Sequence, residues 1–422
     1  MAMAQDAEWQ YMDSLRPPMY VCVRRNNGVK TEEEVEPLEL DGRLHKPEWE
    51  HVPWSNVFED IEGSARQPKA HPKTHMKMMY DDEYLYVGAE MVDEKIWGTF
   101  TKMNSTMYHE NDIEVFLNPD GSRHNYYEFE MNCLNTIWEL VLRKPYKDGY
   151  DIINPYNLPG TKSAVYVDGV TNSPTTKCTK WSVEVAFRLD DLVQFDRMRQ
   201  RPAAAGDVWR VNFSRVHYEL HTIVNKYTNE LMYEKVPDTK EDNIVWSPTG
   251  VIDMHRPEKW GYVLFASTPD FATGEQELSQ ARESFLDAQI AMERILDGIY
   301  YQQRAFFQKH QRYAMELADL YGKDSSGVVQ LPLAPLLQQY NLEFPTLRCR
   351  PPELVSPAKE DRRRRSYAPE LDVDEEIIAL TARRKSMIDS KLKWRFTATI
   401  KSATQEWNIE HDGRLWSSHE VL

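Results

Sequence analysis

The sequence lacks any apolar run of the roughly 20 residues that a membrane-spanning helix needs. Its first residues also lack the uninterrupted apolar stretch of a signal peptide, because Asp6, Glu8 and Asp13 interrupt them. These features exclude a membrane partner and leave the cytoplasm as the default location.

Cysteine is scarce, with only 4 among 422 residues. The four positions are far apart and none forms a CxxC spacing, which excludes a zinc knuckle and a disulfide-dense secreted scaffold. We therefore expect Cys22, Cys133, Cys178 and Cys349 to be free thiols.

Positive charge is also in deficit, since 51 lysines and arginines face 67 aspartates and glutamates, for a net charge of −16. Phosphate backbones repel such a surface, so we expect no nucleic-acid partner. The basic run Arg362–Arg365 is the exception, but Glu360, Asp361 and Pro369 flank it. It is interpreted as a solvated linker, with docking of an acidic partner as the alternative.

The motifs of common enzyme classes are missing, including GxSxG, HExxH, the P-loop and the dinucleotide fingerprint. A glycosidase would need two carboxylates about 5 to 10 Å apart. Glu114, Glu128 and Glu130 could in principle provide such a pair, so a glycoside hydrolase-associated enzyme stays open as an alternative. The favoured interpretation is a protein without catalytic residues.

What the sequence does contain is a long series of short β-type segments between about residues 20 and 266. Several alternate apolar and polar residues, and turn residues such as those at 118–121 separate them. No long amphipathic helix interrupts them, which argues against βαβ units. The pattern predicts a mainly β fold, an antiparallel, jelly-roll-like β-sandwich at 35–266 preceded by an N-terminal segment at 1–34.

The C-terminal part has a different pattern. Thr273 and Gln276 form a capping-box pattern, and apolar residues from Phe285 to Ile299 recur mostly at three- and four-residue steps. This predicts one long amphipathic helix at 273–322. A Pro- and charge-rich linker at 331–370 and a small helix-plus-strand element at 371–422 follow, with a basic helical piece at 381–391. Together they make a smaller α+β region.

An ordered set of motifs resembles the family 9 carbohydrate-binding modules, a DOMON-like β-sandwich family. The set comprises DGRLHKPEW at 41–49, FEDIEG at 58–63, YDDEYLYVGA at 80–89, NDIEVF at 111–116, YYEFEMN at 126–132, WRVNFSR at 209–215, WSP at 246–248 and MHRPEKWG at 254–261. The resemblance implies non-catalytic carbohydrate binding in a shallow site, linked to the catabolism of polysaccharides. It also implies an extracellular location, in contrast to the default above.

The resemblance also implies candidate ligand-binding residues. Tyr108 matches a position that stacks on the sugar, and Glu114 matches a carboxylate that binds hydroxyls. Met254 stands where binding members have a second stacking aromatic, with His255 beside it. The full set of candidates is Tyr108, Glu114, Glu130, Asn132, Trp97, Trp138, Met254 and His255.

Glu130 and Asn132 share one face of a strand, since they are two residues apart. Glu130 replaces a basic residue that family members can use, so the ligand is expected to differ from that of the reference modules. Trp97 and Trp138 are candidates because they lie near predicted strand ends, whereas Trp49, Trp181, Trp209 and Trp260 are expected in the core.

No cofactor is required by this interpretation. Asp41, Asp60 and Glu62 resemble an acidic cluster that could hold a structural calcium ion, and solvated acidic loops are the alternative. A different class of function also stays open. In that alternative the sandwich has lost its sugar site, and the helix at 273–322 binds a protein partner through its apolar stripe.

Overall fold

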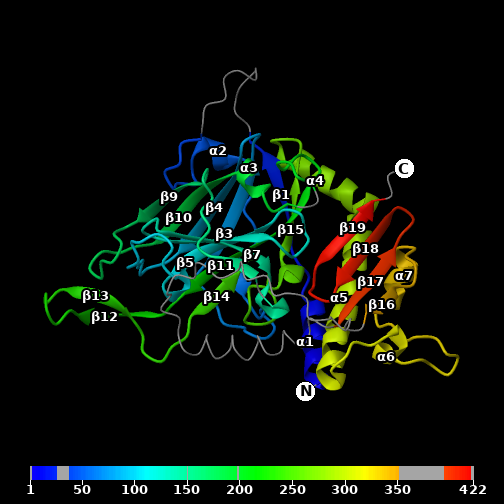
Figure 1. The fold of residues 1–422 in the computed structure, drawn as a ribbon. Helices are drawn as coiled ribbons and strands as arrows, with labels where there is room; N and C mark the ends of the chain where they lie inside the picture. The colour runs from blue at the N-terminus through cyan, green and yellow to red at the C-terminus, as the bar shows by residue number, and fades with distance from the viewer. Residues whose placement is uncertain (1, 26–37, 150, 197–198, 351–393, 420–422) are drawn as a thin grey trace, which may run out of the picture. The chain divides into compact units, whose positions relative to one another are not determined.

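The computed structural model describes residues 2–25, 38–149, 151–196, 199–350 and 394–419 (Figure 1). The chain divides into two compact units, which we describe separately. The sandwich unit comprises Gln10–Pro145 and Tyr150–Asp287, and the C-terminal unit comprises Met1–Trp9, Tyr146–Gly149 and Ala288–Leu422. The first helix, α1 (Ala2–Ser14), has residues in both units.

The first sheet of the sandwich unit has the strand order β8-β7-β6-β5-β11-β15-β1, and β14 and β2 extend it beside β11. Its strands are β8 (Asp151–Ile153), β7 (Ile137–Lys144), β6 (Tyr126–Asn132), β5 (Asp112–Asn118), β11 (Val208–His217), β15 (Gly261–Phe265), β1 (Met19–Arg24), β14 (Asp242–Val245) and β2 (Glu59–Asp60). All pairings within this sheet are antiparallel except that of β1 with β15.

The second sheet has the order β1-β3-β4-β10-β9, so β1 belongs to both sheets. Its other strands are β3 (Thr74–Tyr80), β4 (Tyr84–Val92), β10 (Lys180–Arg188) and β9 (Lys162–Asp168). The first part of β1 runs parallel to β15, and its last two residues pair in parallel with β3. A strand from the segment that we predicted as an N-terminal extension, 1–34, therefore connects the two sheets.

The core lies between the two sheets, because alternate side chains of each strand point inward. Ile113, Val115 and Leu117 of β5 are buried there, and Phe129 of β6 meets Phe187 of β10 with ring centroids 5.1 Å apart. The predicted β-sandwich is thus confirmed, with the parallel pairings of β1 as an addition. The predicted burial of the four tryptophans Trp49, Trp181, Trp209 and Trp260 is also confirmed.

The cysteines of the described structure are free thiols, as predicted. Cys22, Cys133 and Cys178 are buried, and Cys349 is partly exposed. Burial raises the pKa of the Cys133 thiol to about 12, so it stays protonated near neutral pH.

The DGRLHKPEW segment packs on the second sheet. Gly42 has a φ of +79°, and a Cβ at this position would lie 2.3 Å from the backbone nitrogen of Tyr166. Only glycine fits both this conformation and this close approach. Leu44 and Trp49 of the same segment are buried, which explains why the motif needs these residue types.

Short elements connect the strands of the sandwich unit. They are α2 (Pro47–Glu50), α3 (Leu189–Leu192), η1 (Met107–His109) and η3 (Pro257–Lys259). A separate hairpin, β12 (Leu220–Val224) with β13 (Leu231–Lys235), extends away from the two sheets (Figure 1).

The helix predicted at 273–322 begins and ends at other residues in the structure. It begins with α4 (Phe271–Ala281), because the Asp270 side chain accepts a hydrogen bond from the backbone of Ala272 and caps the helix three residues before Thr273. A π-helical turn, η4 (Arg282–Leu286), leads into α5 (Asp287–His310). The helix ends there because Gln311 has a φ of +56°.

In the C-terminal unit, a four-stranded antiparallel sheet follows α5 in sequence. The elements are α6 (Leu317–Tyr321), α7 (Ala334–Gln339), β16 (Thr346–Arg350), β17 (Arg395–Lys401), β18 (Gln405–Glu410) and β19 (Leu415–His419). The predicted linker at 331–370 thus contains α7 and β16. Its remainder, the Arg362–Arg365 run and the predicted basic helix at 381–391 lie outside the described residues.

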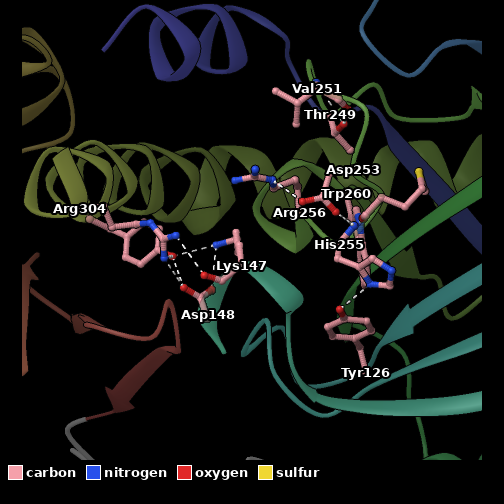
Figure 2. A network of polar contacts seen from close by, with 12 residues as sticks. Tyr126, Lys147, Asp148, Thr249, Val251, Asp253, His255, Arg256, Trp260 and Arg304 are labelled. Carbon is pink, nitrogen blue, oxygen red and sulfur yellow. Dashed lines mark hydrogen bonds and ion pairs between the residues drawn. The ribbon is translucent and has the colours of Figure 1, made fainter. Parts of the chain in front are cut away.

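Side chains of α5 are held within the C-terminal unit. The ring of Tyr313 contacts those of Phe307 and Phe396, both at 4.8 Å between centroids. Figure 2 shows the polar anchor formed with η2 (Tyr146–Asp148), in which Arg304 Nη1 donates to Asp148 Oδ1 over 2.7 Å. Of the apolar stripe that the sequence suggested as a partner surface, Met292, Ile295, Leu296 and Ile299 are buried, whereas Phe285 lies in η4 and is 39% exposed.

Candidate functional site

The candidate site begins with the alternation of β5 and β6. Because Ile113 and Val115 point into the core, Asp112 and Glu114 point to the opposite face of the first sheet. We call this the polar face of β5, β6, β7 and β11. The register places Glu114 opposite Glu130 of β6 on one side. On the other side it lies opposite Ser214 of β11.

Four carboxyl groups on the polar face are buried. The exposed fractions are 0% for Asp112, 5% for Glu114, 7% for Glu128 and 1% for Glu130. One oxygen atom from each of Asp112, Glu114 and Glu130 lies within 4.8 Å of the others. We call these three residues the carboxylate cluster.

The environment of these carboxyl groups favours their neutral form in the absence of a cation. Burial raises the pKa of Glu114 to about 7. Burial, and then the charges of the neighbouring carboxylates, hold the pKa values of Asp112, Glu128 and Glu130 well above their ordinary range. Like charges this close repel one another, so the cluster binds protons or another cation.

An aromatic corner, which we define as Trp97, Tyr108 and Trp138, lies beside the cluster. Trp138 of β7 pairs in register with Glu130. The Tyr108 ring, carried by η1, lies 6.1 Å from the Trp138 ring at an interplanar angle of 36°. Tyr108 is half-buried and, like Trp97, packs against the buried group that contains Tyr218. The structure therefore brings three of the predicted aromatic residues to one end of the polar face.

Asn132 is close to this corner, but the protein's own groups occupy the hydrogen-bonding atoms of its side chain. Its amide nitrogen donates to Glu110 Oε1 over 2.6 Å and to the backbone oxygen of Phe100 over 2.9 Å. Its amide oxygen accepts hydrogen bonds from the backbones of Leu134 and Thr136. With an exposed fraction of 0%, Asn132 retains no free donor for a sugar hydroxyl in this arrangement of the described residues.

The predicted Met254–His255 wall lies toward the other end of β6. Figure 2 shows His255 Nδ1 beside the hydroxyl of Tyr126, at 2.8 Å, and Arg256 held by Asp253. The Nε2 atom of His255 is 4.0 Å from Glu128. Since Tyr126, Glu128 and Glu130 alternate along β6, the carboxylate cluster lies between the aromatic corner and this loop. Met254 itself is 8% exposed.

His255 predicts a pH dependence of stability. Burial lowers its pKa to about 4 from an ordinary value of 6.5, against a smaller opposing effect of Asp253. Between these values the unfolded chain binds a proton that the folded protein does not, so stability falls as the pH falls through this window. We expect wild type to lose roughly 1 to 2 kcal/mol more than His255→Gln between about pH 7 and about pH 5.

Urea unfolding at the two pH values measures this difference. His51→Gln is the matched control, because His51 is exposed, and it should behave like wild type. An equal loss in wild type and His255→Gln would contradict the assignment to His255.

The residues predicted to bind calcium are each engaged elsewhere. Asp41 forms ion pairs with Arg43 and Lys46. Burial acts to raise its pKa, but hydrogen bonds from the Arg43 backbone and side chain and from Lys46 outweigh it and lower the pKa to about 2. Asp60 lies 3.3 Å from His71 Nε2, and Glu62 Oε2 accepts a hydrogen bond from Gln67. Among the described residues, the closely spaced acidic group is the carboxylate cluster, and Asp41, Asp60 and Glu62 do not form one.

Sequence reasoning singled out neither Asp112 nor Ser214 as a site residue. A local signal was present, because DIE at 112–114 and EFE at 128–130 each place two acids on one strand face. Acidic pairs on adjacent strands usually face solvent, and their burial depends on what surrounds the sheet.

Comparison with known proteins identifies one matching family. Residues 40–206 match the family described as carbohydrate family 9 binding domain-like. This range runs from the DGRLHKPEW motif past β10 and confirms the family resemblance there, whereas the motifs at 209–215, 246–248 and 254–261 lie outside it. No curated protein matches the chain significantly.

Three solved structures align with the chain at low identity. The first is a protein from Bacteroides uniformis proposed to bind carbohydrate, with 13% identity, a TM-score of 0.41, and coverage of 59% of this chain and 99% of that one. The second is a family 9 carbohydrate-binding module from Caldicellulosiruptor kristjanssonii in complex with cellotriose, with 14% identity, a TM-score of 0.36, and coverage of 59% and 93%. The third is the module from that organism in complex with glucose, with 14% identity, a TM-score of 0.36, and coverage of 58% and 95%.

One further property concerns membranes. None of the helices among the described residues combines the length and the apolar character that crossing a bilayer requires.

Proposed function

Because residues 40–206 are similar to the carbohydrate family 9 binding domains, we propose that the sandwich unit binds carbohydrate without catalysing a reaction on it. This family match is the observation that carries the proposal. The proposed biological setting is the catabolism of an extracellular polysaccharide, and the sugar is recognised on the polar face of the first sheet.

The chemistry of the polar face supports this proposal. One face of a sugar ring is apolar, and its C–H groups stack on an aromatic ring. The hydroxyls around the rim can donate hydrogen bonds to carboxylates. Tyr108 and Trp138 supply the rings, with centroids 6.1 Å apart, and Glu114 of β5 lies two strands from Trp138 of β7, with Glu130 of β6 between them. In our proposal the sugar stacks on Tyr108 and its hydroxyls donate hydrogen bonds to Glu114. The loop that carries Met254 bounds the site.

The proposal predicts a loss of affinity in Tyr108→Ala. A glycan array screened with and without calcium identifies the sugar class, and calorimetry on the hit measures affinity. Removing the stacking ring is expected to weaken binding by about tenfold or more, since aromatic anchors dominate such contacts. Tyr227→Ala is the matched control, because Tyr227 is 85% exposed and lies in the loop that connects β12 and β13.

Two results would contradict this site or this function. Unchanged affinity in the Tyr108→Ala, Glu114→Ala double variant would place the sugar elsewhere. Folded protein that binds nothing on a broad array would instead favour the alternative class, a protein-interaction role.

A further inference from the structure

The carboxylate cluster has the composition of a site for a hard cation. Asp112, Glu114 and Glu130 come from two neighbouring strands, and one oxygen of each lies within 4.8 Å of the others. Two oxygens on opposite sides of a calcium ion are also separated by about 4.8 Å, since each Ca–O distance is about 2.4 Å. The spacing therefore allows one ion to contact all three residues.

Unpartnered buried oxygens point to a missing positive group. Asp112 Oδ2 and Glu130 Oε2 are buried and have no hydrogen-bond partner among the described residues. No lysine, arginine or histidine in the described structure forms an ion pair with the cluster. Buried carboxylates without a cation or a donor are costly, so the cluster needs something to balance its charge.

Ser214 gives an independent observation, since it is not an acid. Its residue is 0% exposed, and its hydroxyl oxygen accepts no hydrogen bond from the described residues. It lies directly opposite Glu114 in the register of β11 with β5 and interacts with the Glu114 carboxyl. A hydroxyl with two free lone pairs, buried beside three carboxylates, supplies a fourth oxygen ligand.

We propose that Asp112, Glu114, Glu130 and Ser214 bind one calcium ion on the polar face of the first sheet. All the donors are oxygens, which selects hard cations such as Ca²⁺, Mg²⁺ and Mn²⁺ over zinc or copper. Bidentate carboxylates and the hydroxyl can supply six or seven oxygens, the number that Ca²⁺ prefers. Mg²⁺ fits less well, because it usually keeps several waters and the cluster residues are almost fully buried.

This calcium site is separate from the sequence-predicted group at Asp41, Asp60 and Glu62. Glu114 is shared with the proposed sugar site, but the ion is held by protein oxygens alone, so the calcium proposal does not rest on carbohydrate binding. The experiment below contains no sugar, so its failure and a failure of the carbohydrate proposal are distinguishable.

The test is a calorimetric titration of the full chain with CaCl₂ after removal of metal with EDTA. We expect one Ca²⁺ per chain, and an affinity at least about tenfold lower in Glu130→Gln and in Glu114→Gln. The control is Glu139→Gln, because Glu139 is another buried glutamate whose pKa burial raises to about 7, but it lies outside the cluster. Its Ca²⁺ affinity should equal that of wild type.

Terbium luminescence provides a second readout that does not need heat signals. Tb³⁺ replaces Ca²⁺ in oxygen sites and emits when a nearby aromatic ring is excited. Trp138 is opposite Glu130, so Trp138→Phe should reduce the sensitised emission. Folding of each variant is checked by circular dichroism in EDTA, where Glu130→Gln should be at least as stable as wild type because it removes one repelling carboxylate.

The proposal is overturned if folded wild type binds no stoichiometric Ca²⁺, or if Glu130→Gln and Glu139→Gln bind it equally. Stoichiometric binding of Mg²⁺ or Mn²⁺ in preference to Ca²⁺ would also overturn the assignment of the ion.

Discussion

Replacing Glu184 with alanine is expected to lower the free energy of unfolding by about 3 to 5 kcal/mol, a substantial part of the stability of a typical domain. Glu184 lies on β10 with an exposed fraction of 0%. Its side chain points away from the core, because the neighbouring Val183 and Val185 fill the core. It faces the segment that carries the DGRLHKPEW motif.

The large effect follows from the number of donors on one carboxylate. Glu184 Oε2 accepts from the backbone nitrogens of Asp41 and Gly42 and from Lys46 Nζ, each over 2.9 Å. Glu184 Oε1 accepts from Trp49 Nε1 over 2.6 Å. Truncation leaves these donors without their acceptor, and the cost of a buried unpaired group exceeds the value of the bond itself.

Urea unfolding followed by tryptophan fluorescence and circular dichroism measures this change. Glu94→Ala is the control, because Glu94 is exposed, and its effect should stay within about 0.5 kcal/mol. A loss below about 1 kcal/mol in Glu184→Ala would mean that the motif is held mainly by packing of Leu44 and Trp49.

A comparable effect is expected at Arg215, a buried cation at the edge of the core. Its guanidinium is 1% exposed and donates to Asp93 Oδ2 over 2.7 Å, to Thr74 Oγ1 and to the backbone oxygen of Val92. Burial lowers the pKa of Arg215, and the charge of Asp93 opposes this effect. Arg215→Met removes the charged partner of the buried Asp93 and leaves it beside His217 Nε2 at 3.7 Å, whose pKa burial lowers to about 4. The change should cost about 3 to 5 kcal/mol.

A double-mutant cycle separates the pair from its surroundings. Asp93→Asn keeps the shape of the side chain and its acceptor for the backbone of Lys95. The double variant should be more stable than the sum of the single changes predicts, with a coupling of roughly 0.5 to 3 kcal/mol. The control pair is Arg24–Asp82, whose N–O distance of 2.6 Å is similar but whose Asp82 side chain is largely exposed. Its coupling should stay below about 1 kcal/mol. Equal couplings would show that burial of Arg215 is irrelevant.

Local sequence patterns determined much of the fold. The alternation of β5 and β6 fixed which side chains enter the core, because this property depends only on the two-residue period of a strand. The ordered set of motifs from DGRLHKPEW to MHRPEKWG likewise indicated a family 9-like sandwich. Inside the C-terminal region the apolar spacing indicated a long helix, but the capping residue was Asp270, three positions earlier than predicted.

Long-range pairing decided the rest. The carboxylate cluster exists because the register sets Glu114 between Glu130 and Ser214, a residue 100 positions away in the chain. The same kind of contact removed Asn132 from the predicted site, since its amide is satisfied by Glu110 and Phe100 from a separate loop.

A strand's own sequence tells which face a side chain occupies. It cannot tell which other segments pack against that face. The hydrogen bonds and charges of those segments determine whether an acid is a solvated surface group or a buried ligand. The sequence alone therefore determined the sandwich and the residues of the polar face. Only the tertiary structure decided that the carboxylate cluster of Asp112, Glu114 and Glu130 is buried without a basic partner among the described residues.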